Sequence, residues 1–214
     1  HAWGLTNAMI DDADFYVEKT DSLDSKKYRF ERSSIPFDER EEKILVRDAD
    51  SIVFTVRSTR HGPVISDVHP ATSHASAGKS AKASGVVTMR WTGFEPSDEV
   101  YGFYQMNTAT SAAEFEKGVG EIAVPGQSIV YADTANVIAC WAAGKIPIRG
   151  KQPAYLPMDG WTGENEWKGY VPVSQLPKLV NPREGFIASA NQRLGDGKYP
   201  YYVSTLWEPP SRIV

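Results

Sequence analysis

The sequence predicts an α+β fold that is rich in antiparallel sheet and has few helices. Short runs of β-branched and aromatic residues recur between turn residues, which is typical of sheet proteins. Two pairs of these runs are separated by only three residues, which favours hairpins and therefore antiparallel pairing. Only one stretch has the signals of a helix. With 214 residues, 41% of them hydrophobic and 23% charged, the chain is long enough for one large domain or two small ones.

The predicted strands follow from these apolar runs. They cover residues 43–47, 51–57, 86–91, 128–133, 137–141, 186–190 and 201–206. The first two flank a turn at residues 48–50. The fourth and fifth flank residues 134–136, where Asn136 can take the left-handed conformation that a tight turn needs. A last hairpin is expected around residues 195–197, which read Gly-Asp-Gly.

The helix is predicted over residues 111–118. Ser111 is a suitable N-cap, Glu114 completes a capping box three residues later, and Gly118 can end the helix. Two other stretches lack periodicity. We expect residues 66–84, rich in Ser, Ala, His and Lys, to form an exposed excursion. Residues 147–182, rich in proline, should form an ordered loop region.

Composition excludes several classes of function. The net charge of −4 comes with no basic stripe, so we predict no nucleic-acid partner, and no apolar run is long enough to cross a membrane.

Cys140, the only cysteine, lies in an apolar run, where a thiol is usually buried and inert. The histidines lack zinc-site spacing. His61, before Gly62, is expected to make a structural hydrogen bond and not to act as a general base. No nucleophile motif is present.

Two polar stretches leave open questions. The acidic run at residues 11–14 reads Asp-Asp-Ala-Asp and is either a solvated loop or a set of oxygen ligands for a hard cation such as calcium. Asn191 follows directly on the apolar run at 186–190. It is either a turn former or an amide donor aimed at a reacting carbonyl.

A series of motifs resembles the β-chain of the penicillin acylase family and follows the same order along nearly the whole chain. They are A-W-G-L-T-N-A-M-I-D-D-A-D-F-Y-V-E-K (2–19), T-R-H-G-P-V-I (59–65), R-W-T-G (90–93), Y-A-D-T-A-N-V-I-A (131–139), P-M-D-G-W-T-G-E-N-E-W-K-G-Y-V-P (157–172) and N-P-R-E-G-F-I-A-S-A-N-Q-R (181–193). The family belongs to the N-terminal nucleophile hydrolases. The resemblance implies part of a four-layer αββα sandwich with antiparallel sheets.

The resemblance also implies a mechanism. In this family a precursor cleaves itself, and the new β-chain begins with a serine whose own α-amine acts as the base. Because an α-amino group titrates near neutrality, it can accept the hydroxyl proton at working pH. The oxyanion donors correspond to the side chain of Asn191 and the backbone N–H of Asn7, and the supporting arginine corresponds to Arg212. Gln127 stands at a position of the acyl pocket that is apolar in the penicillin G type.

The family's calcium ligands match Asp11, Asp14, the carbonyl of Ala13 and that of Pro153. Val203 stands where a further acid is expected, and another ligand comes from the α-chain. We therefore expect calcium in the complete protein and not in this chain alone. No organic cofactor is implied.

The chain begins at His1 without an initiator methionine, and we expect 1–214 to be a single fragment of the acylase β-chain. The implied partners are the α-chain, the N-terminal part of the β-chain and a small acyl amide substrate. The fragment alone is expected to be inactive and to self-associate. Family habit implies a periplasmic or extracellular location. An acyl-homoserine lactone acylase and a non-catalytic module of the same fold remain as alternatives.

Overall fold

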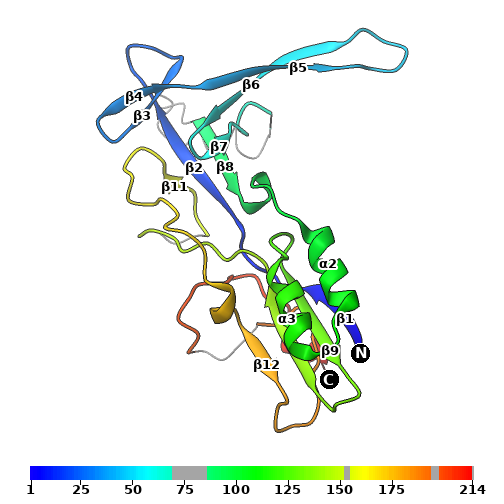
Figure 1. Ribbon diagram of the computed structural model, residues 1–214. Helices are drawn as coiled ribbons and strands as arrows, with labels where there is room; N and C mark the ends of the chain where they lie inside the picture. Colours follow the sequence, from blue (N-terminus) through cyan, green and yellow to red (C-terminus); the bar gives the residue numbers. More distant parts are fainter. Residues whose placement is uncertain (69–85, 152–154, 194–197, 214) are drawn as a thin grey trace. The chain divides into compact units, whose positions relative to one another are not determined.

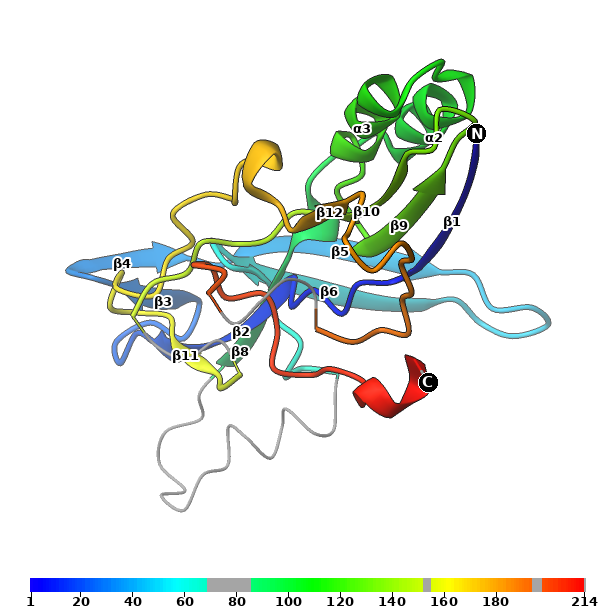
Figure 2. The same ribbon diagram turned by 90° about the horizontal axis from the view of Figure 1, so that it is seen from below.

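The structure is a computed structural model that describes residues 1–68, 86–151, 155–193 and 198–213. These residues divide into two compact units. Unit 1 comprises residues 1–12, 92–148 and 167–214, and unit 2 comprises residues 13–91 and 149–166. Figures 1 and 2 show both units from two directions. Most strand pairs in them are antiparallel, and β11 with β2 is a parallel pair.

Unit 1 is a four-stranded sheet with two helices packed against one face (Figure 2). Its elements are β1 (Ala2–Asn7), a 3₁₀ turn (Thr92–Phe94), α2 (Glu99–Thr108), α3 (Ala112–Gly120), β9 (Gln127–Ala132), β10 (Ile138–Ala143), β12 (Lys178–Val180) and 3₁₀ turns at Val173–Gln175 and Pro210–Ile213. The strand order is β1-β9-β10-β12, which leaves β1 at one edge of the sheet.

Alternation along the strands decides which side chains face the helices. Trp3, Tyr131 and Ala139 stand side by side in register and join the core between sheet and helices, where Phe115 of α3 is fully buried. Thr6 and its neighbours in register therefore lie on the opposite face. That second face carries the polar chemistry described below.

The two helices contact each other at a glycine. A Cβ atom added at Gly118 of α3 would stand 2.8 Å from the carbonyl oxygen of Gly102 and 2.8 Å from the side chain of Met106, both in α2. Real Cβ atoms do not come that close to a backbone oxygen, so the helices must separate to admit a methyl group. Gly118 thus sets the distance at which α2 and α3 pack.

We expect Gly118→Ala to lower the free energy of unfolding by about 1–3 kcal/mol, the usual cost of overpacking a core. Urea denaturation followed by circular dichroism would measure it. Gly4→Ala is the matched control, because the nearest atom to its added Cβ lies 3.9 Å away. Equal stability of both variants would contradict this account of the helix pair.

The predicted helix at 111–118 is confirmed as α3, with Ser111 as the N-cap accepting a hydrogen bond from the N–H of Glu114. The sequence did not predict α2, which begins after Asp98, another capping side chain. Only Gly102 and Met106 of α2 are buried. Such a short apolar stripe, one member of which is glycine, gives little helical signal.

Unit 2 holds two further sheets. Its elements are β2 (Ala13–Thr20), β3 (Lys27–Phe30), β4 (Ser33–Pro36), β5 (Asp38–Ile44), β6 (Ile52–Thr59), β7 (Gly62–Pro63), β8 (Val86–Trp91) and β11 (Met158–Asp159). One sheet has the order β11-β2-β3-β4, with β8 also paired to β2, and the other has the order β5-β6-β7. Strand β5 and strand β6 form the long hairpin labelled in Figure 1.

Several predicted strands are confirmed, and three need correction. The strands at 86–91, 128–133 and 137–141 match β8, β9 and β10 to within two residues. The strand predicted at 43–47 is displaced, because β5 spans Asp38–Ile44 and its charged residues pair with β6. Residues 186–190 and 201–206 are not strands, since the described residues give them no ladder partner. The turn predicted at 195–197 lies outside the described residues.

The two irregular regions are only partly described. Of the excursion predicted at 66–84, residues 69–84 lie outside the described residues. The region at 147–182 contains β11, β12 and a 3₁₀ turn between stretches of irregular backbone. In the described part of the chain, no helix combines the length and apolar character needed to cross a bilayer.

Candidate functional site

Three residues predicted to act together lie together in unit 1. The side-chain nitrogen of Asn191, Nδ2, donates a hydrogen bond to the carbonyl oxygen of Asn7 at 2.9 Å. Arg212 donates from Nη1 to the side-chain oxygen of Asn191 at 3.1 Å. The same Nη1 lies 3.3 Å from the carbonyl oxygen of Ala190. Residues more than 180 positions apart in the sequence thus share one polar cluster.

The pairing of β1 decides where the main chain of Asn7 points. Ala8 donates its N–H to the carbonyl of Gly126 at 3.1 Å, one step beyond the register pair Asn7 and Gln127. Antiparallel pairs alternate between hydrogen-bonded and non-hydrogen-bonded positions, so Asn7 turns its N–H and C=O away from β9. Since β1 is an edge strand, these groups face the open side of the sheet, where Asn191 meets the carbonyl.

Asn191 itself has a left-handed backbone, with φ of +63°. Asparagine tolerates this region better than most residues, so the turn geometry predicted at Asn191 is confirmed, and the predicted role of its amide toward a reacting carbonyl stays a prediction. Because the guanidinium of Arg212 can only donate hydrogen bonds, it bonds to the amide oxygen of Asn191 and not to the amide nitrogen. This bond fixes the orientation of the carboxamide. The NH₂ group is then directed to Asn7. One of its two N–H groups bonds to the Asn7 carbonyl, and the other is a second donor.

The segment before Asn191 is tied to β1 by a side-chain bond. The hydroxyls of Thr6 and Ser189 are 2.6 Å apart, on the face of the sheet opposite the helices. Gln192, directly after Asn191, bonds to the same segment on both sides of Ser189. No sequence pattern marks such a bond, because its acceptor and donor are main-chain groups.

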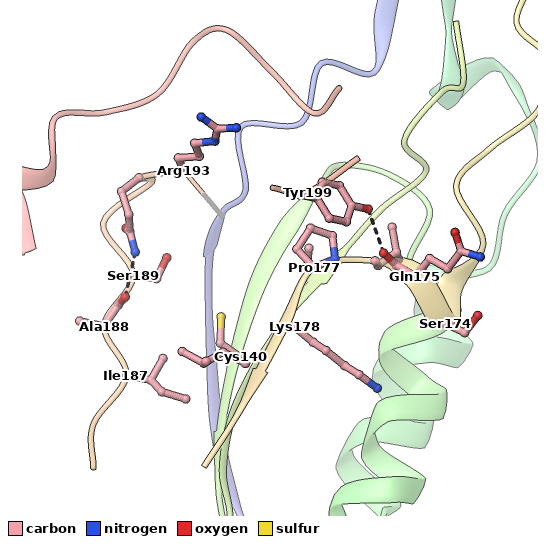
Figure 3. A pocket seen from close by; sticks show the side chains of 14 residues that line it. Cys140, Ser174, Gln175, Pro177, Lys178, Ile187, Ala188, Ser189, Arg193 and Tyr199 are labelled. Carbon is pink, nitrogen blue, oxygen red and sulfur yellow. Dashed lines mark hydrogen bonds between the residues drawn. The ribbon is translucent and has the colours of Figure 1, made fainter. Parts of the chain in front are cut away.

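A cavity of about 700 Å³ lies beside this segment (Figure 3). It is lined in part by Cys140 of β10, by Ala188 and Ser189, and by Tyr199, whose hydroxyl donates to the carbonyl of Gln175 at 2.9 Å. Burial raises the pKa of the Cys140 thiol to about 11, so it is almost entirely protonated at neutral pH. The prediction that this thiol is buried is confirmed, and its raised pKa makes it a poor nucleophile.

The residues predicted to bind calcium belong to both units. Asp11 belongs to unit 1 and accepts from the hydroxyl of Tyr202 at 2.7 Å. Ala13 and Asp14 belong to unit 2, where the buried Asp14 carboxylate accepts from Nε of Arg149 at 2.8 Å. Pro153 lies outside the described residues. Within the described ranges, no three His, Cys, Asp or Glu side chains gather as a metal site. Calcium therefore stays a prediction, and no chemical step below involves it.

Unit 2 contains a buried polar cluster around His61. The ring donates from Nδ1 to Glu18 at 2.7 Å and lies 2.6 Å from Glu166 through Nε2. Tyr16 stacks on the ring with centroids 4.0 Å apart. Burial alone would lower the pKa of His61, but the hydrogen bonds and charges of Glu166 and Glu18 outweigh it and raise that pKa. The expectation of structural hydrogen bonds at His61 is confirmed.

Comparisons with known proteins fit this geometry. The sequence model described as penicillin amidase matches residues 1–214. Penicillin acylase 2 proenzyme of Pseudomonas sp. (strain SE83) is 29% identical over 99% of this chain and 26% of its own length. The acyl-homoserine lactone acylase QuiP of Pseudomonas aeruginosa is 26% identical over 99% of this chain and 25% of its own length. The chain thus spans about a quarter of the length of these curated relatives.

A solved structure gives the same result for the fold. The thermostable penicillin G acylase of Alcaligenes faecalis superposes with a TM-score of 0.79 at 23% identity, over 97% of this chain and 35% of that one. This likeness confirms the predicted α+β class with antiparallel sheets and the N-terminal nucleophile hydrolase fold. Since the family's sequence model covers every residue from His1 to Val214, the chain belongs to the penicillin amidase family.

Proposed function

We propose that this chain supplies the oxyanion donors of an enzyme that cleaves a linear acyl amide through a serine ester. The observation that supports it most directly is the hydrogen bond from the carboxamide of Asn191 to the carbonyl of Asn7. Arg212 orients that carboxamide through its oxygen. The N–H of Asn7 points away from β9, as does the carbonyl that Asn191 contacts, and we propose that a substrate carbonyl oxygen binds at this open edge of β1. Fixed donors of this kind stabilise the charge that forms during acyl transfer.

The reaction has two halves in this proposal. The hydroxyl of a serine outside this chain attacks the amide carbon, and its proton passes to the serine's own α-amine. The C–N bond then breaks, and the amine leaves with that proton. Water attacks the ester in the second half and releases the acid. In each half the carbonyl oxygen becomes negative, and the N–H of Asn7 and one N–H of Asn191 donate to it.

Arg212 acts on the substrate only through Asn191 in this scheme. Its guanidinium occupies the amide oxygen, so the carboxamide cannot rotate and present that oxygen to the developing anion. The positive charge also polarises the amide and makes its N–H groups better donors. Glu208 lies 3.4 Å from the same guanidinium and restrains it.

The acyl group is the least constrained part of the proposal. Gln127 stands opposite Asn7 at a non-hydrogen-bonded position, where facing side chains lie about 4.5–5.5 Å apart at Cβ. Since the resemblance assigns this position to the acyl pocket, a carboxamide here favours an acyl group with a polar atom over a plain phenylacetyl group. The penicillin acylases and acyl-homoserine lactone acylases among the relatives supply the two substrate classes to compare.

We also propose that the active protein contains an α-chain and the N-terminal part of the β-chain, with the serine at the new β-chain start. This chain alone is then inactive. Calcium, where it binds, would use Asp11 and Asp14 with ligands from the rest of the protein. The proposed role of calcium is structural.

Expression of the full-length gene tests the proposal. We expect self-cleavage into two chains, visible by gel electrophoresis and mass spectrometry, and hydrolysis of penicillins, acyl-homoserine lactones or related acyl amides in a panel. Replacement of the serine at the cleavage site by alanine should abolish both. A full-length protein that self-cleaves but hydrolyses no acyl amide would favour the non-catalytic alternative.

A further inference from the structure

The segment before Asn191 needs partners that the sheet does not supply. Residues 186–190 are apolar and β-prone, but they pair with no strand in the described part of the chain. Extended backbone without a ladder leaves its N–H and C=O groups to find other partners. Within the described residues, the backbone before Asn191 is held by side chains.

Gln192 supplies two of the hydrogen bonds that hold this backbone. Its Oε1 accepts from the N–H of Ala190 at 2.6 Å, and its Nε2 donates to the carbonyl of Ala188 at 3.0 Å. A carboxamide has one acceptor and one donor side, as a peptide group does, so the two bonds imitate the pairing of a neighbouring strand. The side chain folds back over the two residues on either side of Ser189.

These bonds fix the backbone at the position that aims Asn191. Ala190 is the residue directly before Asn191, and its carbonyl also accepts from Arg212. Ser189 between the two bonds is tied to Thr6 of β1. Without the Gln192 bonds, the left-handed turn at Asn191 would be held only from its other side, through its carboxamide, Arg212 and the hydrogen bond from the N–H of Glu208 to its carbonyl at 3.1 Å.

We infer that Gln192 is a positioning residue for the oxyanion donor Asn191, an inference that rests on the proposed function. Gln192 itself touches no reacting atom in this scheme. Its carboxamide must be of full length, since both bonds span residues two and four positions back in the chain. In this chain the length of the glutamine side chain, and not only its polarity, allows both bonds.

The test compares variants of the full-length enzyme. Gln192→Met keeps the length of the side chain and removes both hydrogen bonds. We expect kcat to fall about 10-fold with KM changed less than twofold, because a misaimed donor weakens the transition state more than the bound substrate. Gln105→Met is the matched control, since Gln105 lies in α2 and takes no part in the cluster around Asn191. It should retain its kcat.

Gln192→Glu adds a second measurement, the pH dependence of kcat, which a purely structural role of Gln192 would not change. A carboxylate still accepts from Ala190 but repels the carbonyl of Ala188, whereas the protonated acid restores the donor. The ratio of variant to wild-type kcat should therefore rise as pH falls through the carboxyl pKa. This variant also serves if Gln192→Met fails to fold, because its protonated form keeps both bonds.

The outcomes separate the inference from the proposed function. If Asn191→Ala loses turnover while both Gln192 variants keep the wild-type kcat at every pH, the inference on Gln192 is wrong and the proposed function stands. If Asn191→Ala itself retains turnover, the proposed function fails and this inference fails with it. A parallel fall of kcat and rise of KM in Gln192→Met, with no pH-dependent recovery in Gln192→Glu, would mean general loss of structure and would overturn the inference.

Discussion

Asn191→Ala in the full-length enzyme is expected to lower kcat by about 10²–10³-fold, with KM changed little. The substitution removes the donor that we propose acts on the developing oxyanion, and loss of one such donor costs about 2.7–4 kcal/mol of barrier. Arg212 loses its amide partner at the same time. Steady-state kinetics on a hydrolysed acyl amide would measure the effect, and thermal unfolding would show that the fold is kept.

Two further variants sharpen this result. Asn191→Asp keeps the size of the side chain but replaces the donor by a charge that repels the oxyanion, so it should be at least as inactive as alanine. Asn107→Ala is the control. Asn107 also makes side-chain hydrogen bonds, to Trp3 and to the carbonyl of Phe103, but it lies in α2. Wild-type turnover in Asn191→Ala would remove the proposed mechanism.

His61→Leu is expected to lower the free energy of unfolding of unit 2 by about 3–5 kcal/mol. Leucine has a volume close to that of histidine, but it leaves the fully buried carboxylate of Glu18 without its cationic partner. Removing one member of a buried ion pair typically costs this much, because the remaining charge is uncompensated. Thr59 and Thr88 still donate to Glu18, at 2.7 and 3.0 Å, and keep the cost within that range.

The pH dependence of stability follows from the same cluster. The pKa of His61 is raised above 6.5, so its contribution is fully present below 6.5 and is lost as pH rises through the raised value. Burial favours a higher pKa for Glu166, but the hydrogen bond and charge of His61 outweigh it and hold that pKa below 4.5. Its contribution is present above 4.5 and is lost as pH falls through the lowered value. Stability from the cluster is therefore greatest between 4.5 and 6.5.

Urea denaturation at several pH values measures both effects. The difference in stability between wild type and His61→Leu should be largest inside this window and should shrink at alkaline pH. A difference that does not change with pH would show that the ring is neutral and that the cluster holds no buried cation.

The sequence predicted elements that are held by local signals and missed those that are held by distant partners. The helix α3 was predicted because Ser111 caps it locally, by accepting from the N–H of Glu114 three residues later. Strand β2 gave no such signal, because it buries Asp14, Tyr16 and Glu18 and exposes Phe15, the reverse of an ordinary amphipathic strand. The carboxylates can be buried only because Arg149 and His61 reach them from far along the chain. No residue pattern within β2 predicts those partners.

The candidate site shows the same division. Asn7, Asn191 and Arg212 were identified by resemblance to a family, and the motifs themselves say nothing of distance. The strand predicted at 186–190 was wrong because its apolar pattern is real but its ladder is replaced by the side chain of Gln192. A side chain that bonds to main-chain groups requires no particular residue type as its partner, so sequence patterns cannot predict such a bond.

The outward turn of the main chain at Asn7 has a consequence for variation within the family. What residue 7 offers is a peptide N–H, which nineteen of the twenty amino acids possess, whereas residue 191 offers a carboxamide that only two possess. Any residue except proline can therefore stand at position 7 without loss of the proposed donor, because proline alone lacks the N–H group. The side chain of Asn7 merely accepts from the N–H of Met9, at 3.0 Å, a task that aspartate or serine can share.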